Sequence, residues 1–444
     1  MGNLFGTDGV RGIANTELTP ELAFRLGRAS VPVLAGGEKR PRILIGRDTR
    51  ISGDMLEAAI AAGFCAAGAD VLLAGIMPTP AVAYLTRELS AQAGVVLSAS
   101  HNPAEYNGIK FFFGDGYKLP DAVEDEIERG LDNEPAGRPA GGAVGRVLRL
   151  ENAADKYIDY AVSTADVDLS GLKVVVDCAN GAAARIAPAV LKRLGASVRA
   201  VNAAPDGLNI NAGCGSTHPE AMQAAVRESG ADVGIAHDGD ADRVLAADSR
   251  GELVDGDQIM TICALDRLRR GELPGNTLVA TVMSNLGLDL ALQPAGAKVL
   301  RTKVGDRYVL EEMLARGLRM GGEQSGHIIF LDLNTTGDGI ITALQLLKVV
   351  RESGEPLHVL AGQMKRLPQV LLNVPVSRRE ALPGNPRITA AVRQAEERLG
   401  EFGRLLVRAS GTEPLVRVMV EGEDEKALQE IASQIAGIIQ QELA

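Results

Sequence analysis

Short runs of aliphatic and β-branched residues alternate with amphipathic or alanine-rich stretches through most of the chain. The runs that predict strands lie at residues 43–45, 71–73, 95–97, 174–176 and 278–282. Several of them are followed at once by a polar, turn-forming string. This alternation is typical of α/β units with largely parallel sheets, and ligands bind at the carboxyl ends of such strands. Because the pattern recurs, we expect three related α/β domains.

The pattern changes after residue 371, where strands flank one helix and a closing helix is expected at residues 425–442. This order favours a smaller α+β domain at the carboxyl end. A chain of 444 residues also exceeds what one hydrophobic core usually supports. Linker composition at residues 133–145, with breaks near 251–256 and 366–369, separates the segments. The predicted domains are 1–152, 153–253, 254–366 and 367–444.

Composition narrows the classes of partner and the location. There are 57 acidic and 46 basic side chains, and the net charge of −11 weighs against a nucleic acid or an anionic membrane as partner. The four cysteines are far apart and match neither a zinc site nor a short disulfide framework. We see no secretory signal, and the apolar stretch 58–69 is too short to cross a bilayer. A cytoplasmic protein is expected.

An acidic string, Asp-Gly-Asp-Ala-Asp-Arg at residues 238–243, follows the predicted strand 233–236. Its three carboxylates alternate with small residues, so they can converge on one hard cation. A calcium EF-hand is excluded, because Arg243 replaces the glycine of the sixth position and Ser249 replaces the twelfth glutamate. Mg²⁺, which binds few carboxylates together with water and phosphate oxygens, fits better. A solvated acidic turn is the alternative.

A serine-containing turn, Ser-Ala-Ser-His-Asn-Pro at residues 98–103, follows the predicted strand 95–97. The Asn-Pro step forces a turn that can present a serine hydroxyl at the edge of a sheet. A plain structural turn is the alternative. Lys110, which returns close to the turn, favours the functional interpretation, because a cation there can neutralise charge during phosphoryl transfer.

Two further strings have the composition of ligand-binding loops. Residues 408–414 read Arg-Ala-Ser-Gly-Thr-Glu-Pro, with Arg417 beyond, and supply guanidinium groups, hydroxyls and an open loop for a phosphate. Residues 321–327 read Gly-Gly-Glu-Gln-Ser-Gly-His and can bind sugar hydroxyls. For residues 408–414 the alternative is a hairpin turn with surface arginines. For residues 321–327 the alternative is a turn whose histidine is structural. His327 and His237 are each consistent with a structural role.

Absent motifs exclude several enzyme classes. The chain has no GxxxxGK[ST] and no GxGxxG string, so a nucleotide-driven kinase and a Rossmann dehydrogenase have no fingerprint here. HExxH and GxSxG are also absent. Phosphoryl chemistry without a nucleotide loop suggests that the protein itself carries the phosphoryl donor.

Together with Phe-Gly-Thr-Asp-Gly-Val-Arg-Gly at residues 5–12, these strings resemble the α-D-phosphohexomutase family in order and spacing. The resemblance spans the whole chain. Residues 209–220, residues 281–287 and the glutamine of the 321–327 string are similar to the bacterial glucosamine branch. The family implies three α/β domains and a smaller, mobile fourth domain around a central cleft. It also implies interconversion of glucosamine 6-phosphate and glucosamine 1-phosphate, for amino-sugar and cell-wall precursor synthesis.

The resemblance also implies roles for individual residues. Ser100 would be a phosphoserine, and one Mg²⁺ per subunit would be held by a phosphoryl oxygen on Ser100 and by Asp238, Asp240 and Asp242. Lys110, Arg11, His101 and His327 are candidates for handling charge and the hydroxyl proton. Sugar contacts are expected from Glu323, Ser325, His327 and Lys303. Phosphate contacts are expected from Arg408, Ser410, Gly411, Thr412 and Arg417.

The expected cycle passes through glucosamine 1,6-bisphosphate, and this compound or glucose 1,6-bisphosphate would also serve as primer. The nearest alternative function is a mutase for glucose or mannose phosphates, which would keep the catalytic residues and act on a different sugar. A hydrolase would need water at the phosphoserine. A non-catalytic sugar-phosphate-binding protein is the alternative outside the enzymes. Members of the family are often dimers, so the assembly to test is a homodimer.

Overall fold

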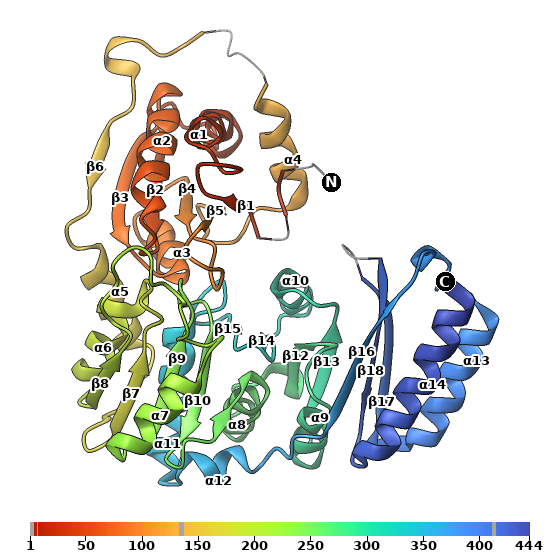
Figure 1. Ribbon diagram of the computed structural model, residues 1–444. Coiled ribbons are helices and arrows are strands. Elements are labelled where there is room, and N and C mark those ends of the chain that lie inside the picture. Colours follow the sequence, from red (N-terminus) through yellow and green to blue (C-terminus); the bar gives the residue numbers. More distant parts are fainter. Residues whose placement is uncertain (1–3, 7, 133–136, 411–413) are drawn as a thin grey trace. The chain divides into compact units, whose positions relative to one another are not determined.

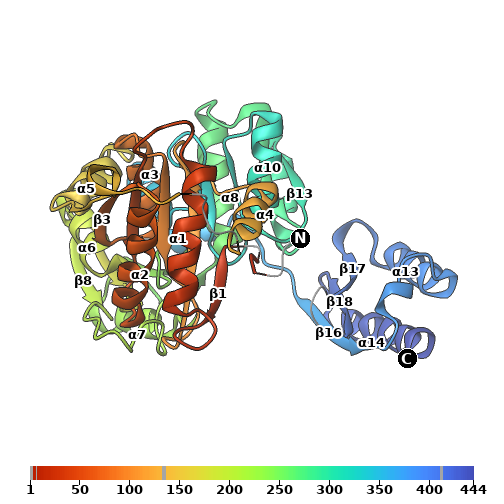
Figure 2. The same ribbon diagram turned by 90° about the horizontal axis from the view of Figure 1, so that it is seen from above.

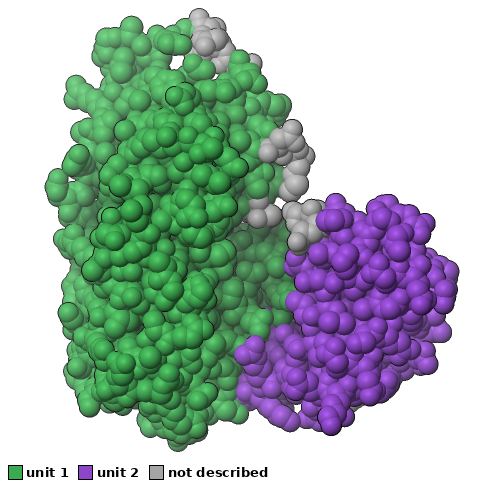
Figure 3. Space-filling view, in the orientation of Figure 1, with its two compact units in different colours: residues 1–283, 299–362 green, residues 284–298, 363–444 purple. Residues whose placement is uncertain are grey.

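The computed structural model describes residues 4–6, 8–132, 137–410 and 414–444 (Figures 1 and 2). The chain forms two compact units, which Figure 3 colours separately. The first unit comprises residues 1–283 and 299–362, and the second comprises residues 284–298 and 363–444. Each unit is built around sheets covered by helices, as the alternating sequence pattern predicts.

The first sheet of unit 1 has six strands in the order β1-β5-β4-β2-β3-β6. The strands are β1 Val10–Ile13, β2 Arg42–Arg47, β3 Asp70–Ile76, β4 Ala93–Leu97, β5 Tyr106–Phe113 and β6 Val147–Arg149. Strands β4, β2, β3 and β6 run parallel, and β5 is antiparallel to both β4 and β1. Every residue of β4 is buried, which fits its central place in the sheet. The loop 98–103 therefore leaves the carboxyl end of a central strand.

Four helices accompany this sheet. They are α1 Pro20–Leu34, α2 Ser52–Ala66, α3 Thr79–Glu88 and α4 Asp121–Gly130. Helices α1 and α2 lie side by side (Figure 2), and two glycines let their backbones approach closely. A Cβ atom at Gly63 would lie 2.2 Å from the carbonyl oxygen of Phe24, and one at Gly27 would lie 2.5 Å from that of Ile60. The glycines thus fix how closely α1 and α2 pack.

The second sheet has the order β11-β10-β9-β7-β8. Its strands are β7 Lys173–Asp177, β8 Ser197–Val201, β9 Val233–His237, β10 Val244–Asp248 and β11 Leu253–Val254, with helices α5 Ala153–Ser163, α6 Ala183–Arg193 and α7 Glu220–Ser229. Strand β7 is parallel to β8 and β9, whereas β9 and β10 form an antiparallel hairpin. The acidic string 238–243 is the turn of that hairpin.

The third sheet has the order β13-β12-β14-β15. Its strands are β12 Thr277–Thr281, β13 Lys298–Thr302, β14 Met320–Gly322 and β15 Ile328–Phe330, with helices α8 Gly256–Arg269, α10 Asp306–Arg316, α11 Gly339–Ser353 and α12 Leu357–Ala361. Asp255 and Gln258 form a capping box at the start of α8. Strands β14 and β15 form a hairpin whose turn carries the glycine-rich string.

Unit 2 contains a three-stranded antiparallel sheet in the order β16-β18-β17. Its elements are α9 Gly287–Leu292, β16 Gln369–Pro375, α13 Pro386–Leu399, β17 Arg404–Ala409, β18 Leu415–Glu421 and α14 Glu425–Leu443. Helices α13 and α14 pack together and bury the apolar face of the sheet. The expected fold class is thereby confirmed: three α/β domains with mixed, mostly parallel sheets precede a domain with an antiparallel sheet.

The structure differs locally from the sequence expectation. The apolar stretch 58–69 is divided between α2, which ends at Ala66, and the turn into β3, where Gly68 adopts φ +92°. Strand β6 follows the expected linker 133–145 directly and pairs with β3 at the sheet edge. Strand β11 lies within the break expected near 251–256. Among the helices of the described ranges, none has the length and apolar character needed to cross a bilayer.

The close approach of α1 and α2 generates a stability prediction. Gly63→Ala places a methyl group against the carbonyl of Phe24, so overpacking of about 1–3 kcal/mol should exceed the helix-propensity gain of about 1 kcal/mol. Gly437→Ala in α14 is the matched control, because no neighbouring group of the described residues lies within 4 Å of the place that its methyl group would occupy. Scanning calorimetry should show a lower melting temperature for Gly63→Ala and an equal or higher one for Gly437→Ala. A more stable Gly63→Ala protein would contradict the packing argument.

Candidate active site

The reacting candidate, Ser100, sits in the loop after β4 and is 1% exposed. Its hydroxyl donates to Asp238 Oδ2 at 2.6 Å, and its Oγ lies 3.2 Å from Nδ1 of His101. The backbone at Ser100 has φ +49°, a left-handed conformation that residues other than glycine rarely adopt. Such strain at a buried serine is typical of functional sites. The structure therefore brings the serine loop and the acidic hairpin turn together.

The acidic turn forms a carboxylate cluster. The ligand atoms of Asp238, Asp240 and Asp242 lie within 4.8 Å of one another, and all three residues are buried. Gly239 lets the turn pack against the serine loop, since a Cβ there would lie 2.6 Å from the carbonyl oxygen of Ser100. Oδ1 of Asp240 and Oδ1 of Asp242 have no hydrogen-bond partner within the described structure. Buried acceptors without donors are costly, so the cluster fits a divalent cation with oxygen ligands, such as Mg²⁺.

The pKa shifts of the cluster reflect the same crowding of charge. Burial, followed by the negative charges of Asp242 and Asp240, raises the pKa of Asp238. Burial also favours the neutral form of Asp242, but His327, Lys110 and Arg243 outweigh it and hold the pKa of that carboxyl well below its usual range. Cations that the chain already provides therefore neutralise the turn only in part.

Lys110 connects this cluster to the amino-terminal loop. Its Nζ lies 2.9 Å from Asp240 Oδ2, 2.9 Å from Asp8 Oδ2 and 4.0 Å from Asp242 Oδ2. Burial lowers the pKa of Lys110, but the charges of Asp240 and Asp8 outweigh burial and raise it above its ordinary value. Lys110 thus keeps its positive charge beside the carboxylate cluster and is suited to electrostatic stabilisation.

A second lysine extends the chain of charges to the third α/β domain. Lys118 Nζ lies 2.6 Å from both Asp8 Oδ1 and Asp306 Oδ2. His327 then lies between two carboxylates, with Nδ1 3.5 Å from Asp242 Oδ2 and Nε2 3.5 Å from Asp306 Oδ2. Burial lowers the pKa of His327, but the two aspartates outweigh it and raise the value. Alternating charges therefore link loops of all three α/β domains around one site.

A cavity of about 410 Å³ opens beside these groups. Its lining residues come from loops of the three α/β domains: Leu4, Gly6, Asp8, Gly9, Arg11, His101, Lys118, Asp242, Arg243, Val304, Gly305, Asp306, Glu323 and His327. Arg11 pairs with Asp8 at its rim. Burial, together with Arg243 and Arg11, lowers the pKa of His101, so a neutral imidazole is favoured at neutral pH. Such a volume suits a small anionic ligand surrounded by both signs of charge.

The predicted sugar-binding residues differ in their placement. Glu323 and His327 line the cavity, and Glu323 Oε1 accepts a hydrogen bond of 3.1 Å from the Gly305 N–H. Ser325 lies in the same turn, but outside the cavity lining, and its hydroxyl is buried without a hydrogen-bond partner in the described part of the chain. Lys303 is exposed, with its Nζ 5.7 Å from the ring centre of Tyr308, and does not line the cavity. The structure therefore gathers two of the four residues at the cavity.

The predicted phosphate-binding string lies in unit 2. Arg408 of β17 and Arg417 of β18 are opposite each other in the antiparallel register, so two positive charges lie on the same face of the sheet. Burial, followed by the charge of Arg417, lowers the pKa of Arg408. Ser410 donates its N–H to the carbonyl oxygen of Leu415 at 2.9 Å. Gly411 and Thr412 lie outside the described residues.

Several residues of the site were not predicted from the sequence. Asp8 had a signal, since it lies in the amino-terminal string 5–12, but Lys118 and Asp306 had none. Thr79, the first residue of α3, donates its hydroxyl to Asp240 Oδ2 at 2.6 Å. His237, which directly precedes the acidic turn, has its Nδ1 3.2 Å from the carbonyl oxygen of Arg243, and burial lowers its pKa to about 4. It thus supports the far end of the acidic turn.

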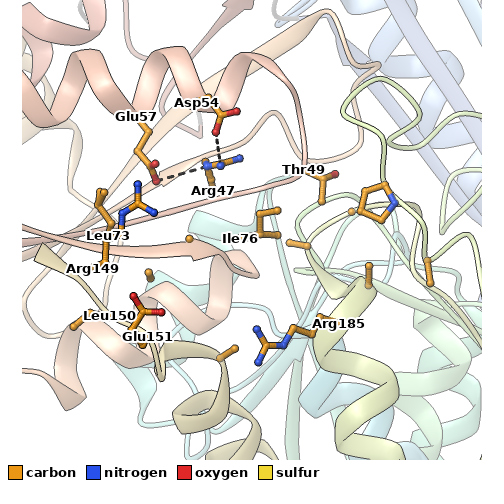
Figure 4. A pocket seen from close by; sticks show the side chains of 18 residues that line it. Arg47, Thr49, Asp54, Glu57, Leu73, Ile76, Arg149, Leu150, Glu151 and Arg185 are labelled. Atoms are coloured by element: carbon orange, nitrogen blue, oxygen red, sulfur yellow. Dashed lines mark hydrogen bonds and ion pairs between the residues drawn. The ribbon is translucent and has the colours of Figure 1, made fainter.

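A larger cavity of about 770 Å³ lies elsewhere in unit 1, between the carboxyl end of β3 and the start of α6 (Figure 4). There Arg47 pairs with Asp54 and lies 3.6 Å from Glu57 Oε1, while Arg185 comes from the second α/β domain. Neither the serine nor the carboxylate cluster lines this cavity. The smaller cavity, which Asp242 of the cluster lines, is therefore the better candidate for the chemistry.

Comparisons with family models cover most of the chain. Phosphoglucomutase/phosphomannomutase alpha/beta/alpha domains I, II and III match residues 2–138, 155–251 and 255–367, and the C-terminal domain of that family matches residues 371–438. Phosphoglucosamine mutase of Pelotomaculum thermopropionicum is 61% identical over 443 residues, covering 99% of this chain and 100% of that protein. The phosphoglucosamine mutase of Symbiobacterium thermophilum is 59% identical, with 100% of both chains covered.

Two solved structures are similar in fold. A phosphoglucomutase/phosphomannomutase family protein from Burkholderia thailandensis has a TM-score of 0.82 and 27% identity, covering 99% of this chain and 97% of that one. N-acetylphosphoglucosamine mutase of Aspergillus fumigatus, crystallised with GlcNAc-6P and magnesium, has a TM-score of 0.68 and 18% identity, with 99% and 95% covered. At that identity the second likeness concerns the fold alone.

The carboxylate cluster generates a metal-binding prediction. Asp240→Asn removes one negative charge and one good oxygen ligand, so Mg²⁺ affinity should fall by at least about 10-fold. Asp248→Asn is the matched control, because Asp248 is a buried carboxylate of β10 that is bonded to Arg250, outside the cluster. Isothermal titration of each protein with Mg²⁺ measures the affinity. Equal Mg²⁺ affinity in the parent and Asp240→Asn would exclude the cluster as the cation site.

Proposed function

The chain belongs to the phosphoglucomutase/phosphomannomutase family, and on that basis we propose an isomerase that interconverts glucosamine 6-phosphate and glucosamine 1-phosphate. Full-length relatives about 60% identical are phosphoglucosamine mutases, which supports this choice of sugar. The observation that carries the chemistry is the 2.6 Å contact between the Ser100 hydroxyl and Asp238 in the carboxylate cluster. It joins a nucleophile to a cation site beside a cavity of suitable size.

In the proposed reaction, Ser100 carries a phosphoryl group that the substrate accepts. A phosphoserine adds about two negative charges beside three carboxylates, so a cation is needed to stabilise the loaded state. Mg²⁺, held by Asp238, Asp240, Asp242 and a phosphoryl oxygen, would withdraw charge from the group being transferred. Lys110 supplies a second positive charge at Asp240 of the cluster, where it would offset negative charge that develops during transfer.

The first transfer moves the phosphoryl group from Ser100 to O1 of glucosamine 6-phosphate. The O–P bond to the serine breaks as the O1–P bond forms, O1 loses its proton, and the serine oxygen gains one. The result is glucosamine 1,6-bisphosphate and a free serine. The bisphosphate must then turn, so that its 6-phosphate returns a phosphoryl group to Ser100 and glucosamine 1-phosphate is released. Lys110, Arg11, His101 and His327 are the candidates for handling the hydroxyl proton and the charge. Arg11 and the two histidines line the cavity, and of these three the histidines are suited to moving a proton.

Different loops are proposed to bind the sugar and the phosphate. Glu323 and His327 line the cavity and are suited to the sugar hydroxyls, with Ser325 in the same turn. Arg408 and Arg417 face each other across β17 and β18, and a phosphate would relieve their repulsion. Ser410, Gly411 and Thr412 complete the proposed phosphate loop. Lys303, the fourth residue proposed for the sugar, is exposed and lies outside the cavity lining.

The product would feed amino-sugar and cell-wall precursor synthesis in the cytoplasm. One Mg²⁺ per subunit, a 1,6-bisphosphate primer and a homodimeric assembly complete the proposal. The alternative sugars, glucose and mannose, would use the same serine and the same metal site. The choice among them therefore depends on a direct comparison of substrates.

The serine relay predicts that Ser100→Ala abolishes the mutase activity, by more than about 10³-fold, because the phosphoryl acceptor is removed. Ser90→Ala is the matched control. Ser90 shares the left-handed backbone, with φ +49°, but it is exposed and lies outside the site. A coupled assay for glucosamine 1-phosphate measures both variants, and circular dichroism checks their folding. Substantial turnover by folded Ser100→Ala protein would rule out the relay.

The proposed sugar is tested by assaying glucosamine, glucose and mannose 6-phosphates with the same enzyme preparation. We expect kcat/KM for glucosamine 6-phosphate to exceed the other two by at least about 10-fold, the range that one good polar contact can provide. A higher kcat/KM for mannose or glucose 6-phosphate would retain the mechanism but reject the sugar.

A further inference from the structure

The backbone of the serine loop is held by side chains. The carbonyl oxygen of Ser100 accepts hydrogen bonds from Arg50 Nη2 at 3.0 Å and from Asn211 Nδ2 at 2.8 Å. The carbonyl oxygen of Asn102 accepts from the same two groups, at 2.8 Å and 3.0 Å. A guanidinium and a carboxamide therefore hold the same two carbonyls of a loop whose serine has a left-handed backbone.

The guanidinium belongs to a fully buried group of the first α/β domain. Arg50 and Asp48 are both 0% exposed, and Arg50 Nε lies 2.8 Å from Asp48 Oδ2. The same carboxylate accepts a 2.6 Å hydrogen bond from the Ser98 hydroxyl, and Ser98 Oγ accepts the N–H of Ser100 at 2.9 Å. Both polar groups of the Ser100 backbone are thereby fixed, and the charge of Arg50 is neutralised internally.

The carboxamide comes from the second α/β domain. Asn211 lies between β8 and α7, is 7% exposed and has φ +57°. Its own N–H donates to the carbonyl oxygen of Ala179 at 2.9 Å, which anchors it to the loop after β7. A Cβ at Gly239 would lie 2.9 Å from Asn211 Nδ2, so the carboxamide packs against the carboxylate turn as well as the serine loop.

We propose that Asn211 is a positioning residue for phosphoryl transfer, an inference that rests on the mutase function proposed above. Ser100 must present its oxygen in the same place during two opposite transfers, while the charge it carries changes. An uncharged carboxamide holds the two carbonyls equally well in both states of the serine. It also ties the serine loop to the acidic turn, so that the nucleophile and the cation site keep their separation. Small errors in such a separation slow transfer strongly without weakening substrate binding.

The test is Asn211→Asp, which keeps the size of the side chain and tolerates the left-handed backbone. The substitution replaces the Nδ2 donor with a carboxylate oxygen, which cannot donate to the two carbonyl oxygens. We expect kcat to fall by about 10- to 100-fold, while KM for glucosamine 6-phosphate changes by less than about twofold. The titrated Mg²⁺ affinity should change by less than about threefold, because the three aspartates remain. Asn209→Asp is the matched control: Asn209 Nδ2 donates to the carbonyl oxygen of Ala204 at 3.1 Å, in the same segment but away from the serine loop. Its kcat should match the parent.

Asn211→Gly provides the second variant, since glycine tolerates the positive φ and adds no charge. It should also lower kcat at unchanged KM, so it tests the proposal if the aspartate variant does not fold. Parent kcat in both folded variants would overturn the proposal, as would losses that merely follow the folded fraction by circular dichroism. Phosphate incorporation at Ser100 of the parent is measured in parallel. Its absence would reject the serine relay itself, and with it the inference, whereas its presence with unaffected variants would reject only Asn211.

Discussion

The site depends on the electrostatic balance around one buried serine. Three carboxylates within 4.8 Å of one another are unfavourable by themselves, and a phosphoryl group on the serine would add to the repulsion. Lys110 neutralises part of this charge from within the chain, and two oxygens of the cluster that have no hydrogen-bond donor among the described residues suit a dication. The excess of negative charge makes the buried site energetically unfavourable by itself. It also means that the electrostatic energy of the site changes when a phosphoryl group moves onto or off the serine.

The ion pairs around the serine join the first three domains. Lys110 and Lys118 come from the first domain, the carboxylate cluster from the second, and Asp306 and His327 from the third. Their contacts form a network in which carboxylates and basic groups largely alternate and which runs through all three domains. Burial strengthens each contact and penalises any unpaired member. The charges thereby couple the arrangement of the domains to the proposed chemistry.

The sequence predicted the class of fold and four ligand-binding loops, because strand periodicity and short polar strings are local features. It predicted the carboxylates of the acidic turn as one cluster for the same reason. Lys118 and Asp306 could not be paired from the sequence, since their contact joins positions far apart on different domains. The hold of Asn211 on the serine loop depends on the packing of one domain against another. Lys303 shows that a position next to the cavity in sequence does not fix where a side chain lies: Val304 and Gly305 line the cavity, whereas the Lys303 side chain is exposed.

The most direct test of the account is a single-turnover experiment with a ³²P-labelled sugar 1,6-bisphosphate, rapid quenching and peptide mapping. Label should appear covalently on the peptide that contains Ser100 within one turnover, and unlabelled glucosamine 6-phosphate should then remove it into product. Label that never appears on the polypeptide, while the unlabelled enzyme still interconverts the two glucosamine phosphates, would contradict the phosphoserine mechanism.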